Sequence, residues 1–220
     1  MLKIIYGACD SSKSEYLYSL AIDALSSGNA FLVVPEQAAL SAEKRIYELA
    51  KEKSSLGLEV LNFERLAENV FRKCGFLSYN YINDSAKKLL LRKAMCDIKP
   101  SLSEYGAWTS DEGFISNMLA QITEFKHSKV SPETLARVSE ALASEDAAKN
   151  SKLIKRLDDF ALIFAAYNAL VSERFDDRGD DLSKSSYLIL SAVPFSDSSF
   201  FLDEFNGFTL QQYDVISALL

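Results

Sequence analysis

The feature that most constrains the fold is a succession of short apolar segments, each followed by a polar junction and then by a helical pattern. Such segments lie at residues 2–6, 30–35 and 58–63, and the apolar residues after each of them recur at helical spacing. Strands that alternate with helices in this way build parallel sheets covered by helices. The sequence therefore predicts an α/β core.

The middle of the chain follows a different pattern. Between residues 81 and 181, helical stripes recur without a convincing strand. Ser131, Pro132 and Glu133 provide the cap, the proline and the acid that favour the start of a helix, and Asp84 is a second candidate cap. This region is predicted to be an all-helical insertion.

Strand character returns near the end of the chain. Apolar runs at residues 187–193 and 200–202 are each read as strands, and a helical pattern follows at residues 210–220. We therefore predict two domains, an α/β core and a helical insertion. The core comprises residues 1–80 and 186–220, and the insertion comprises residues 81–185.

Composition excludes several classes of protein. The chain of 220 residues carries a net charge of −7, so it does not coat nucleic acid by charge alone and any DNA contact must be local. Only 8 glycines and 4 prolines argue against an all-β or disordered chain. The cysteines Cys9, Cys74 and Cys96 lack disulfide or zinc spacing, and no apolar run is long enough to span a membrane. We expect a cytoplasmic protein.

A phosphate-binding loop is suggested directly after the first apolar segment. Gly7, Lys13 and Ser14 match the first glycine, the lysine and the hydroxyl residue of the GxxxxGK[ST] pattern. In such loops backbone N–H groups surround phosphate oxygens and the hydroxyl holds Mg²⁺. Ser12 replaces the second glycine and Asp10 adds a negative charge, which weakens the pattern. The alternative is a serine-rich turn that caps a helix.

Two carboxylates follow the apolar run at residues 200–202. Asp203 and Glu204 stand where phosphate-loop proteins place an Asp that holds Mg²⁺ and a Glu that polarises water. Ser14 and Asp203 are the candidate magnesium ligands. The alternative is that the pair caps a helix.

The other strand-to-helix junctions carry candidate DNA contacts. Open α/β sheets bind ligands at such junctions, and Gln37, Asn62 and Arg65 are polar residues placed there, with Phe63 as a stacking platform for a base. The alternative is that Phe63 belongs to the core and Arg65 pairs with an acid.

Two features of the insertion also bear on nucleic-acid binding. Lys87, Lys88, Arg92 and Lys93 form the densest basic cluster in the sequence. Trp108, the only tryptophan, either pins the insertion to the sheet or stacks on a base.

These motifs, in this order, resemble the N-terminal region of the AddB/RexB family, which supplies the B subunit of the bacterial ATP-dependent helicase/deoxyribonuclease. The resemblance spans nearly the whole chain. Its most specific segments are VPEQ at residues 34–37, FERLA at residues 63–67 and DEFNGFT at residues 203–209. The last segment is also similar to motif II of Rep/UvrD-like superfamily 1 helicases.

The resemblance implies a fold and a set of roles. The core would be a P-loop NTPase-like helicase domain 1A, and the insertion a 1B-like subdomain. Gly7, Ser12, Lys13 and Ser14 would belong to the nucleotide site, and Asp203 and Glu204 to motif II. Gln37, Asn62, Phe63 and Arg65 would lie where relatives contact single-stranded DNA. The nuclease domain of the family, with its iron–sulfur cluster, lies far C-terminal to these residues.

The resemblance also implies a function in recombinational DNA repair. The family pairs with an AddA/RexA-type helicase–nuclease subunit and processes double-strand DNA ends. We expect this chain to guide DNA and contact the partner, with a degenerate site that binds Mg-ATP weakly and with no helicase or nuclease activity of its own. Two alternatives stay open, a small P-loop nucleotide-binding enzyme or kinase and an α/β protein-interaction scaffold.

Overall fold

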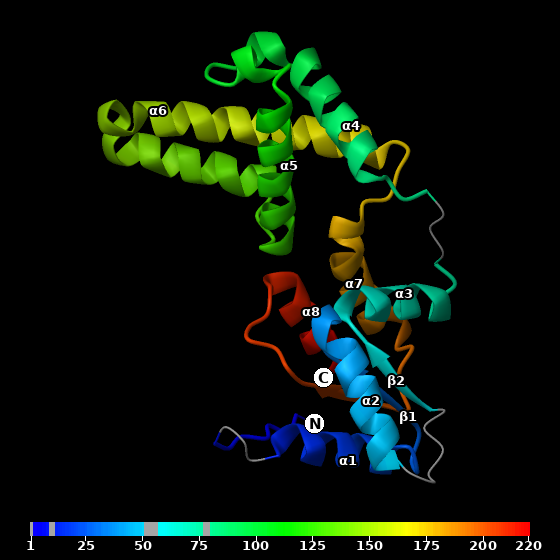
Figure 1. The fold of residues 1–220 in the computed structure, drawn as a ribbon. Helices are drawn as coiled ribbons and strands as arrows, with labels where there is room; N and C mark the ends of the chain where they lie inside the picture. Colours follow the sequence, from blue (N-terminus) through cyan, green and yellow to red (C-terminus); the bar gives the residue numbers. More distant parts are fainter. Residues whose placement is uncertain (1, 9–11, 51–56, 77–79) are drawn as a thin grey trace. The chain divides into compact units, whose positions relative to one another are not determined.

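The computed structural model describes four parts of the chain, residues 2–8, 12–50, 57–76 and 80–220, and they form two compact units (Figure 1). The first unit comprises Met1–Leu77 and Asp181–Leu220, and the second comprises Ser78–Asp180. The three strands of the described residues belong to the first unit. None of the helices in these ranges is both long and apolar enough to cross a membrane.

A parallel sheet forms the centre of the first unit. Its strands are β1 (Asn29–Val33), β2 (Leu58–Leu61) and β3 (Ser198–Leu202), in the spatial order β2-β1-β3. Both neighbours run parallel to β1, and Phe31 is level with Glu59 on one side and with Phe200 on the other. The predicted α/β class and its parallel sheet are confirmed, as are the strands expected near residues 30–35, 58–63 and 200–202.

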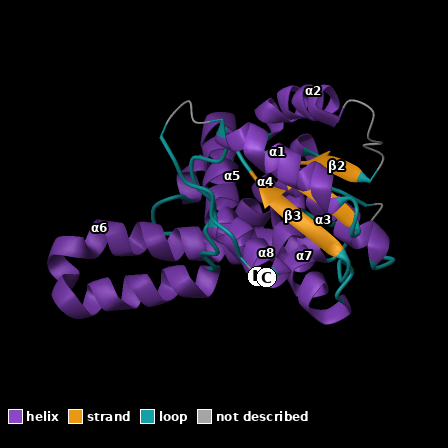
Figure 2. Ribbon diagram, turned by 90° about the horizontal axis from the view of Figure 1, so that it is seen from below, coloured by secondary structure: helices purple, strands orange, loops and turns teal. Residues whose placement is uncertain are grey.

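Helices cover both faces of the sheet because the central strand is apolar on both sides. Leu32 and Val34 face a cluster that includes α1 (Lys13–Ala24) and α2 (Ala39–Ala50). Phe31 and Val33 face a second cluster with α3 (Phe63–Lys73), α7 (Asp181–Ala192) and α8 (Leu210–Leu219). Figure 2 shows the strands between these two groups of helices. A 3-10 turn, Glu36–Ala38, leads from β1 towards α2.

The strand expected at residues 2–6 is not formed. Residues 2–8 have no regular secondary structure, and Leu2, Ile4 and Tyr6 are 60%, 75% and 91% exposed. An apolar segment becomes a strand only where its backbone pairs with another strand. The three strands of the described sheet pair with one another, and residues 2–8 pair with none of them. Cys9 and Asp10 lie outside the described residues.

The strand expected at residues 187–193 is also wrong, because this run belongs to the helix α7. Ser185, Ser186 and Ile189 are its buried residues, a helical spacing, whereas Tyr187 and Leu190 are 71% and 67% exposed. A short apolar run does not by itself separate a strand from a helix. The small side chains of Ser185 and Ser186 allow α7 to pack closely against α3 and α8, and this packing favours the helix.

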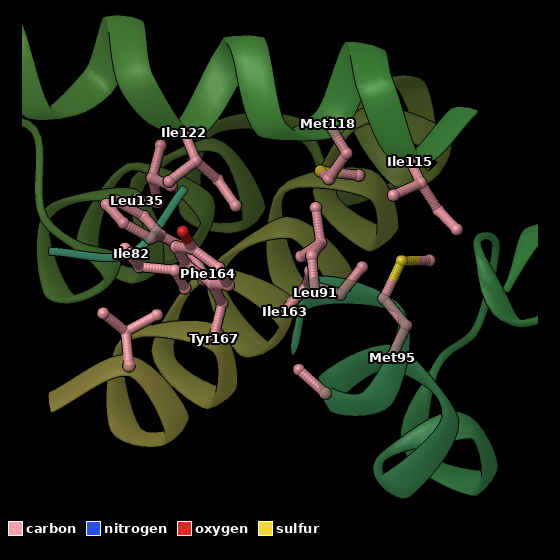
Figure 3. Packing of buried hydrophobic residues seen from close by; sticks show 13 residues of the cluster. Ile82, Leu91, Met95, Ile115, Met118, Ile122, Leu135, Ile163, Phe164 and Tyr167 are labelled. Carbon is pink, nitrogen blue, oxygen red and sulfur yellow. The ribbon is translucent and has the colours of Figure 1, made fainter. Parts of the chain in front are cut away.

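The second unit is helical and has its own hydrophobic core. Its helices are α4 (Asp84–Asp97), α5 (Glu112–His127) and α6 (Pro132–Ser172), with 3-10 turns at Lys99–Ser101, Gly106–Trp108 and Arg178–Asp180. Figure 3 shows the core, in which Leu91 and Met95 of α4 meet Ile115 of α5 and Ile163 of α6. Ser131 caps α6 as predicted, whereas the cap of α4 is Asn83 rather than Asp84.

The helix α6 doubles back on itself. In a straight helix, residues 19 apart would be separated by about 28 Å, yet the Ser139 hydroxyl donates to the Asp158 carboxylate at 2.5 Å. The Asn150 amide likewise donates to the Leu142 carbonyl at 3.4 Å. The segment therefore forms two antiparallel arms, which Figure 1 shows in yellow-green and yellow. Residues 150–172 are called the second arm below.

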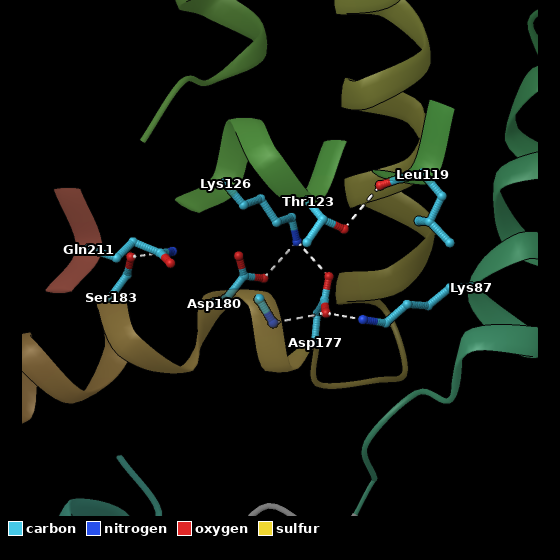
Figure 4. A network of polar contacts seen from close by, with 9 residues as sticks. Lys87, Leu119, Thr123, Lys126, Asp177, Asp180, Ser183 and Gln211 are labelled. Carbon is cyan, nitrogen blue, oxygen red and sulfur yellow. Dashed lines mark hydrogen bonds and ion pairs between the residues drawn. The ribbon is translucent and has the colours of Figure 1, made fainter. Parts of the chain in front are cut away.

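A buried ionic network fixes the end of the second unit (Figure 4). Asp177, 5% exposed, accepts from Lys87 of α4 at 2.7 Å and from Lys126 of α5 at 2.8 Å, and Lys126 also bonds Asp180 at 3.0 Å. Burial raises the pKa of the Asp177 carboxyl, but the two ammonium groups and the Gly179 N–H outweigh it and hold the pKa at about 2. Two acids of the charged stretch at residues 173–181, Asp177 and Asp180, therefore have a structural role.

Removal of the central carboxylate should destabilise the chain. Asp177→Asn would leave two largely buried ammonium groups without a counter-ion, and we expect a loss of about 3–5 kcal/mol in the free energy of unfolding, measured by urea denaturation. The control is Asp97→Asn, which breaks the exposed pair with Lys93 and should cost less than about 1 kcal/mol. Equal losses in the two variants would contradict the assignment of Asp177 to a buried ionic network.

The same carboxylate should make stability depend on pH. Its folded pKa lies below the ordinary value of 3.8, so its contribution is full above that value and is lost as pH falls towards 2. The contribution is about 2 kcal/mol. Urea titrations between about pH 5 and about pH 2 should show this component in the wild type and not in Asp177→Asn.

Candidate nucleotide and DNA site

The junctions that follow the three strands meet at one edge of the sheet. Because β1, β2 and β3 are parallel, their carboxyl ends share an edge, where open α/β sheets bind ligands. Gln37 follows β1, Asn62 follows β2, and Asp203 follows β3. The structure thus brings together three candidates that lie far apart in the sequence.

The helix α1 presents its N-terminal end to this same edge. At its other end, the Leu25 side chain lies 3.1 Å from the position that a Cβ on Gly57 would occupy, just before β2 begins. Nearer its start, Tyr18 packs in the same cluster as Phe201 of β3 and lies beside Asp203, just after that strand ends. The helix therefore runs antiparallel to the strands. Lys13 and Ser14, in its first turn, lie towards the edge that carries Asp203.

The bond between Tyr18 and Asp203 is the central contact of the site. Tyr18 is 2% exposed, and burial, followed by the negative charge of Asp203 and the hydrogen bond to it, raises the pKa of the phenol to about 12. The Asp203 backbone N–H donates to the Val33 carbonyl at 3.2 Å, which ties the residue to the central strand. The carboxylate is therefore held at the end of the sheet.

One oxygen of this carboxylate has no protein partner within the described ranges. The Asp203 Oδ2 atom is buried and makes no hydrogen bond to those residues. A buried acceptor of this kind is costly unless something binds it. The next residue, Glu204, has φ 64°, a left-handed conformation that is uncommon for a residue with a side chain and that clusters at functional sites.

A magnesium ion fits this oxygen in part. Carboxylate and hydroxyl oxygens are its usual protein ligands, and Asp203 with Ser14 would supply them. The described residues contain no group of three or more His, Cys, Asp or Glu side chains arranged to hold a metal. Any ion here would therefore depend on waters or phosphate oxygens for most of its ligands.

Lys13 is engaged within the suggested phosphate loop. Its ammonium donates to the Gly7 and Ala8 carbonyls, both at 3.0 Å. In a working loop the lysine faces the nucleotide phosphates instead. Ser12, in place of glycine, has φ 52° at the N-cap of α1 and makes no side-chain cap to the helix. Asp10 lies outside the described residues.

Two candidate DNA contacts have structural roles. The Asn62 side chain accepts from the Arg65 backbone N–H at 2.8 Å and caps α3. The Phe63 ring is 5% exposed and packs against Phe205 and Phe208, with centroid distances of 5.4 and 6.2 Å. Phe63 thus belongs to the core in this structure. The exposed candidates at this edge are Gln37 and Arg65.

The basic cluster on α4 is largely neutralised. Lys87 is bonded to Asp177, Arg92 lies 3.6 Å from Glu112, and Lys93 lies 2.8 Å from Asp97. Of the four residues, Lys88 alone has no such pair among the described acids. The dense run of positive charge in the sequence therefore does not produce an equally dense positive surface.

Tyr18 is not among the site residues predicted from the sequence. The residue lies one helical turn after Ser14, so the two share a face of α1, and this spacing was the available signal. Tyrosine at helical spacing is ordinary core composition, and its bond to Asp203 becomes visible only when the two ends of the chain meet in the fold.

Comparison with known proteins identifies relatives over the whole chain. Residues 4–220 match the family described as "ADDB, N-terminal". Proteins from Clostridium kluyveri (strain NBRC 12016) and Thermoanaerobacter sp. (strain X514) are 32% and 29% identical over 222 residues, and a protein from Clostridium botulinum (strain Hall) is 30% identical. Each is named as the B subunit of an ATP-dependent helicase/deoxyribonuclease. The alignments cover 100% of this chain and 19% of each relative.

Removal of the Tyr18 hydroxyl should destabilise the site. Tyr18→Phe takes away a hydrogen bond from a carboxylate that already has one unpartnered oxygen, and we expect a loss of about 1–3 kcal/mol in the free energy of unfolding. Urea denaturation measures it, and Tyr16→Phe on the exposed side of the same helix is the control. The loss should shrink in an Asp203→Ala background. An equal loss in both backgrounds would show that the bond contributes nothing.

Proposed function

Because this chain belongs to the family of AddB N-terminal regions, we propose that it is the helicase-like N-terminal part of a B subunit that processes double-strand DNA ends for recombinational repair. The observation that carries the proposal is the match over residues 4–220 to relatives that are named as B subunits of an ATP-dependent helicase/deoxyribonuclease. The chain spans 19% of the length of these relatives, so the ATP-dependent cleavage of DNA is assigned to the whole assembly.

In this proposal the first unit corresponds to a helicase 1A domain and the second to an inserted 1B-like subdomain. Support comes from the parallel sheet, from α1 with its N-terminal end at the carboxyl edge, and from Asp203 at the end of the neighbouring strand β3. Phosphate-loop proteins also hold a nucleotide at a helix N-terminus and its metal ion at an Asp that follows a strand, although the strand expected before the loop is not formed here. Gly7, Ser12, Lys13 and Ser14 would form the nucleotide site, and Glu204 would follow the metal-binding Asp203.

The nucleotide site is proposed to be weak. The Lys13 ammonium must leave two carbonyl oxygens before it can reach a phosphate, and Tyr18 occupies part of the Asp203 carboxylate. Both contacts compete with Mg-ATP. A phosphate-loop kinase needs these groups free, so the contacts favour a guiding role over that alternative.

DNA guidance is proposed for the carboxyl edge of the sheet. Gln37 and Arg65 are exposed there, and a guanidinium and an amide suit contacts to phosphates and base edges. Asn62 would act by fixing the first turn of α3, which carries Arg65. The partner would be an AddA/RexA-type subunit, since the relatives are named as one subunit of a larger enzyme.

The nucleotide proposal is tested by titration of Mg-ATP into the chain and into Lys13→Ala. We expect no saturable binding at millimolar nucleotide in either protein, because the lysine and the carboxylate are already engaged. Lys44→Ala, an exposed lysine of α2, is the control. Saturable binding that survives in Lys44→Ala and is lost in Lys13→Ala would contradict a weakened site.

The DNA proposal is tested by fluorescence anisotropy of a labelled single-stranded oligonucleotide. Arg65→Ala should weaken binding and lower the slope of log affinity against log salt by about 0.7, the share of one neutralised phosphate on a single strand. Gln37→Ala should weaken binding without a change in that slope, because it carries no charge. Lys44→Ala should leave both quantities unchanged. Unaltered affinity in Arg65→Ala and Gln37→Ala together would contradict DNA guidance by this edge.

A further inference from the structure

An unpaired basic face lies on the second arm of α6. Lys152, Lys155 and Arg156 are exposed, and they precede Asp159 by whole helical turns, so all four share one face of the helix. None of the three cations pairs with an acid among the described residues. In a chain with a net charge of −7, whose α4 cations are mostly paired, this makes the face unusual.

A buried carboxylate fixes a loop beside this face. Asp159 is 1% exposed and accepts hydrogen bonds from the backbone N–H groups of Ser103, Glu104 and Tyr105, at 2.8, 2.7 and 2.8 Å. These three bonds compensate its negative charge. The loop that joins α4 to α5 is therefore anchored to the same side of α6 that carries the cations, and its conformation is held from within.

The anchored loop presents an aromatic side chain. Trp108 is 50% exposed and stacks on Phe114, with ring centroids 6.1 Å apart and an interplanar angle of 25°. Phe114 in turn packs against Tyr105 at 5.1 Å. One face of the indole is thus supported by protein. The exposed half is large, apolar and held without the loss of side-chain freedom that a mobile residue would undergo on binding.

The cations lie close to this loop. Arg156 precedes Asp159 by about one helical turn, and the Asp159 carboxylate accepts from the Tyr105 backbone N–H at 2.8 Å, so Arg156 lies on the part of α6 that holds the loop. Lys99 is a further exposed cation, and its Cγ atom lies 4.0 Å from the position of a Cβ on Gly106 in the same loop. The acids in the same region are Glu104, Asp111, Glu112 and Asp158. Glu104 is half-buried, Asp111 caps α5, Glu112 lies 3.6 Å from Arg92, and Asp158 accepts a hydrogen bond from Ser139 on the first arm. The cations of the second arm have no such partner among the described residues.

We infer that this surface, formed by Trp108 with Lys99, Lys152, Lys155 and Arg156, binds single-stranded DNA. Single-strand sites combine a cationic track for the phosphates with aromatic rings on which bases stack, and both elements are present on one rigid support. Trp108 would stack on a base, and the cations of α6 would contact the backbone on either side. The inference rests on the proposed function only for the choice of DNA as the ligand, and it assigns a surface in the second unit.

The sole tryptophan of the chain reports directly on this contact. Titration with an oligothymidylate should quench the Trp108 fluorescence saturably, because a stacked base lies against the indole, and added salt should reverse the quenching. Binding that occurs without a change in Trp108 fluorescence would overturn the inference. Quenching of equal strength by polyglutamate would overturn it as well, because it would identify an acidic polypeptide as the ligand.

Charge-matched variants separate the surface from general electrostatics. The triple variant Lys152→Gln, Lys155→Gln, Arg156→Gln should bind a labelled oligothymidylate about tenfold or more weakly and lower the salt slope by about 2, or roughly 0.7 for each lost contact. The control triple Lys44→Gln, Arg72→Gln, Arg137→Gln removes the same charge from other exposed positions and should retain affinity. Equal losses in the two triples would overturn the inference.

The aromatic contact has its own test. Trp108→Leu should weaken binding about fivefold or more, the effect of one lost base stack, with circular dichroism and the melting temperature to show that the fold is intact. Trp108→Phe should recover part of the affinity, and unchanged affinity in Trp108→Leu would overturn the inference. If Arg65→Ala and Gln37→Ala leave the affinity unchanged while DNA quenches Trp108, only the sheet-edge proposal fails. If Trp108→Leu leaves the affinity unchanged while Arg65→Ala lowers it, only the inference about this surface fails.

Discussion

The pairing of β1 with both other strands is the constraint on which the first unit depends. Every backbone position from Ala30 to Val33 is level with a residue of β2 and a residue of β3, and the side chains are buried on both faces. A strand buried in this way must be apolar throughout, and helices must cover both faces. Since the strands are parallel, the same pairing gathers the ends of three distant segments at one edge. The candidate site is thus a consequence of the core.

At that edge, Tyr18 and Asp203 bring a buried phenol and a carboxylate together at the end of the sheet. A carboxylate placed to hold a metal ion is a liability when no ion is bound, because a buried acceptor needs a donor. The Tyr18 hydroxyl provides one, and Lys13 finds carbonyl oxygens of its own loop. Lys13 is therefore satisfied within the protein, whereas Asp203 keeps one buried oxygen without a partner among the described residues. In the proposed function, a chain that guides DNA requires no motor chemistry from these positions.

The elements that could be predicted from the sequence are those with strong local signals. The continuous apolar run that became β1, the Ser131-Pro132 start of α6 and the placement of Gln37, Arg65 and Asp203 after strand ends all follow from local patterns. Long-range contacts decided the rest. In the sequence, Asp177 is one acid of a charged stretch, and only the structure shows that Lys87 and Lys126 surround it. The helix α7 looks like a strand because its close packing depends on serines that carry no apolar signal.

Charge pairing also changes where nucleic acid can bind. The cluster of cations in α4 dominates the sequence, yet ion pairs with acids occupy most of it. The attraction of a surface for phosphate depends on the charge that stays uncompensated. The second arm of α6 has fewer cations, but none of them pairs with an acid among the described residues. The nearby Asp159 accepts hydrogen bonds from backbone N–H groups and forms no ion pair with these cations. The same carboxylate therefore fixes the Trp108 loop and leaves the neighbouring cations available, which joins the aromatic and the electrostatic halves of a single-strand site.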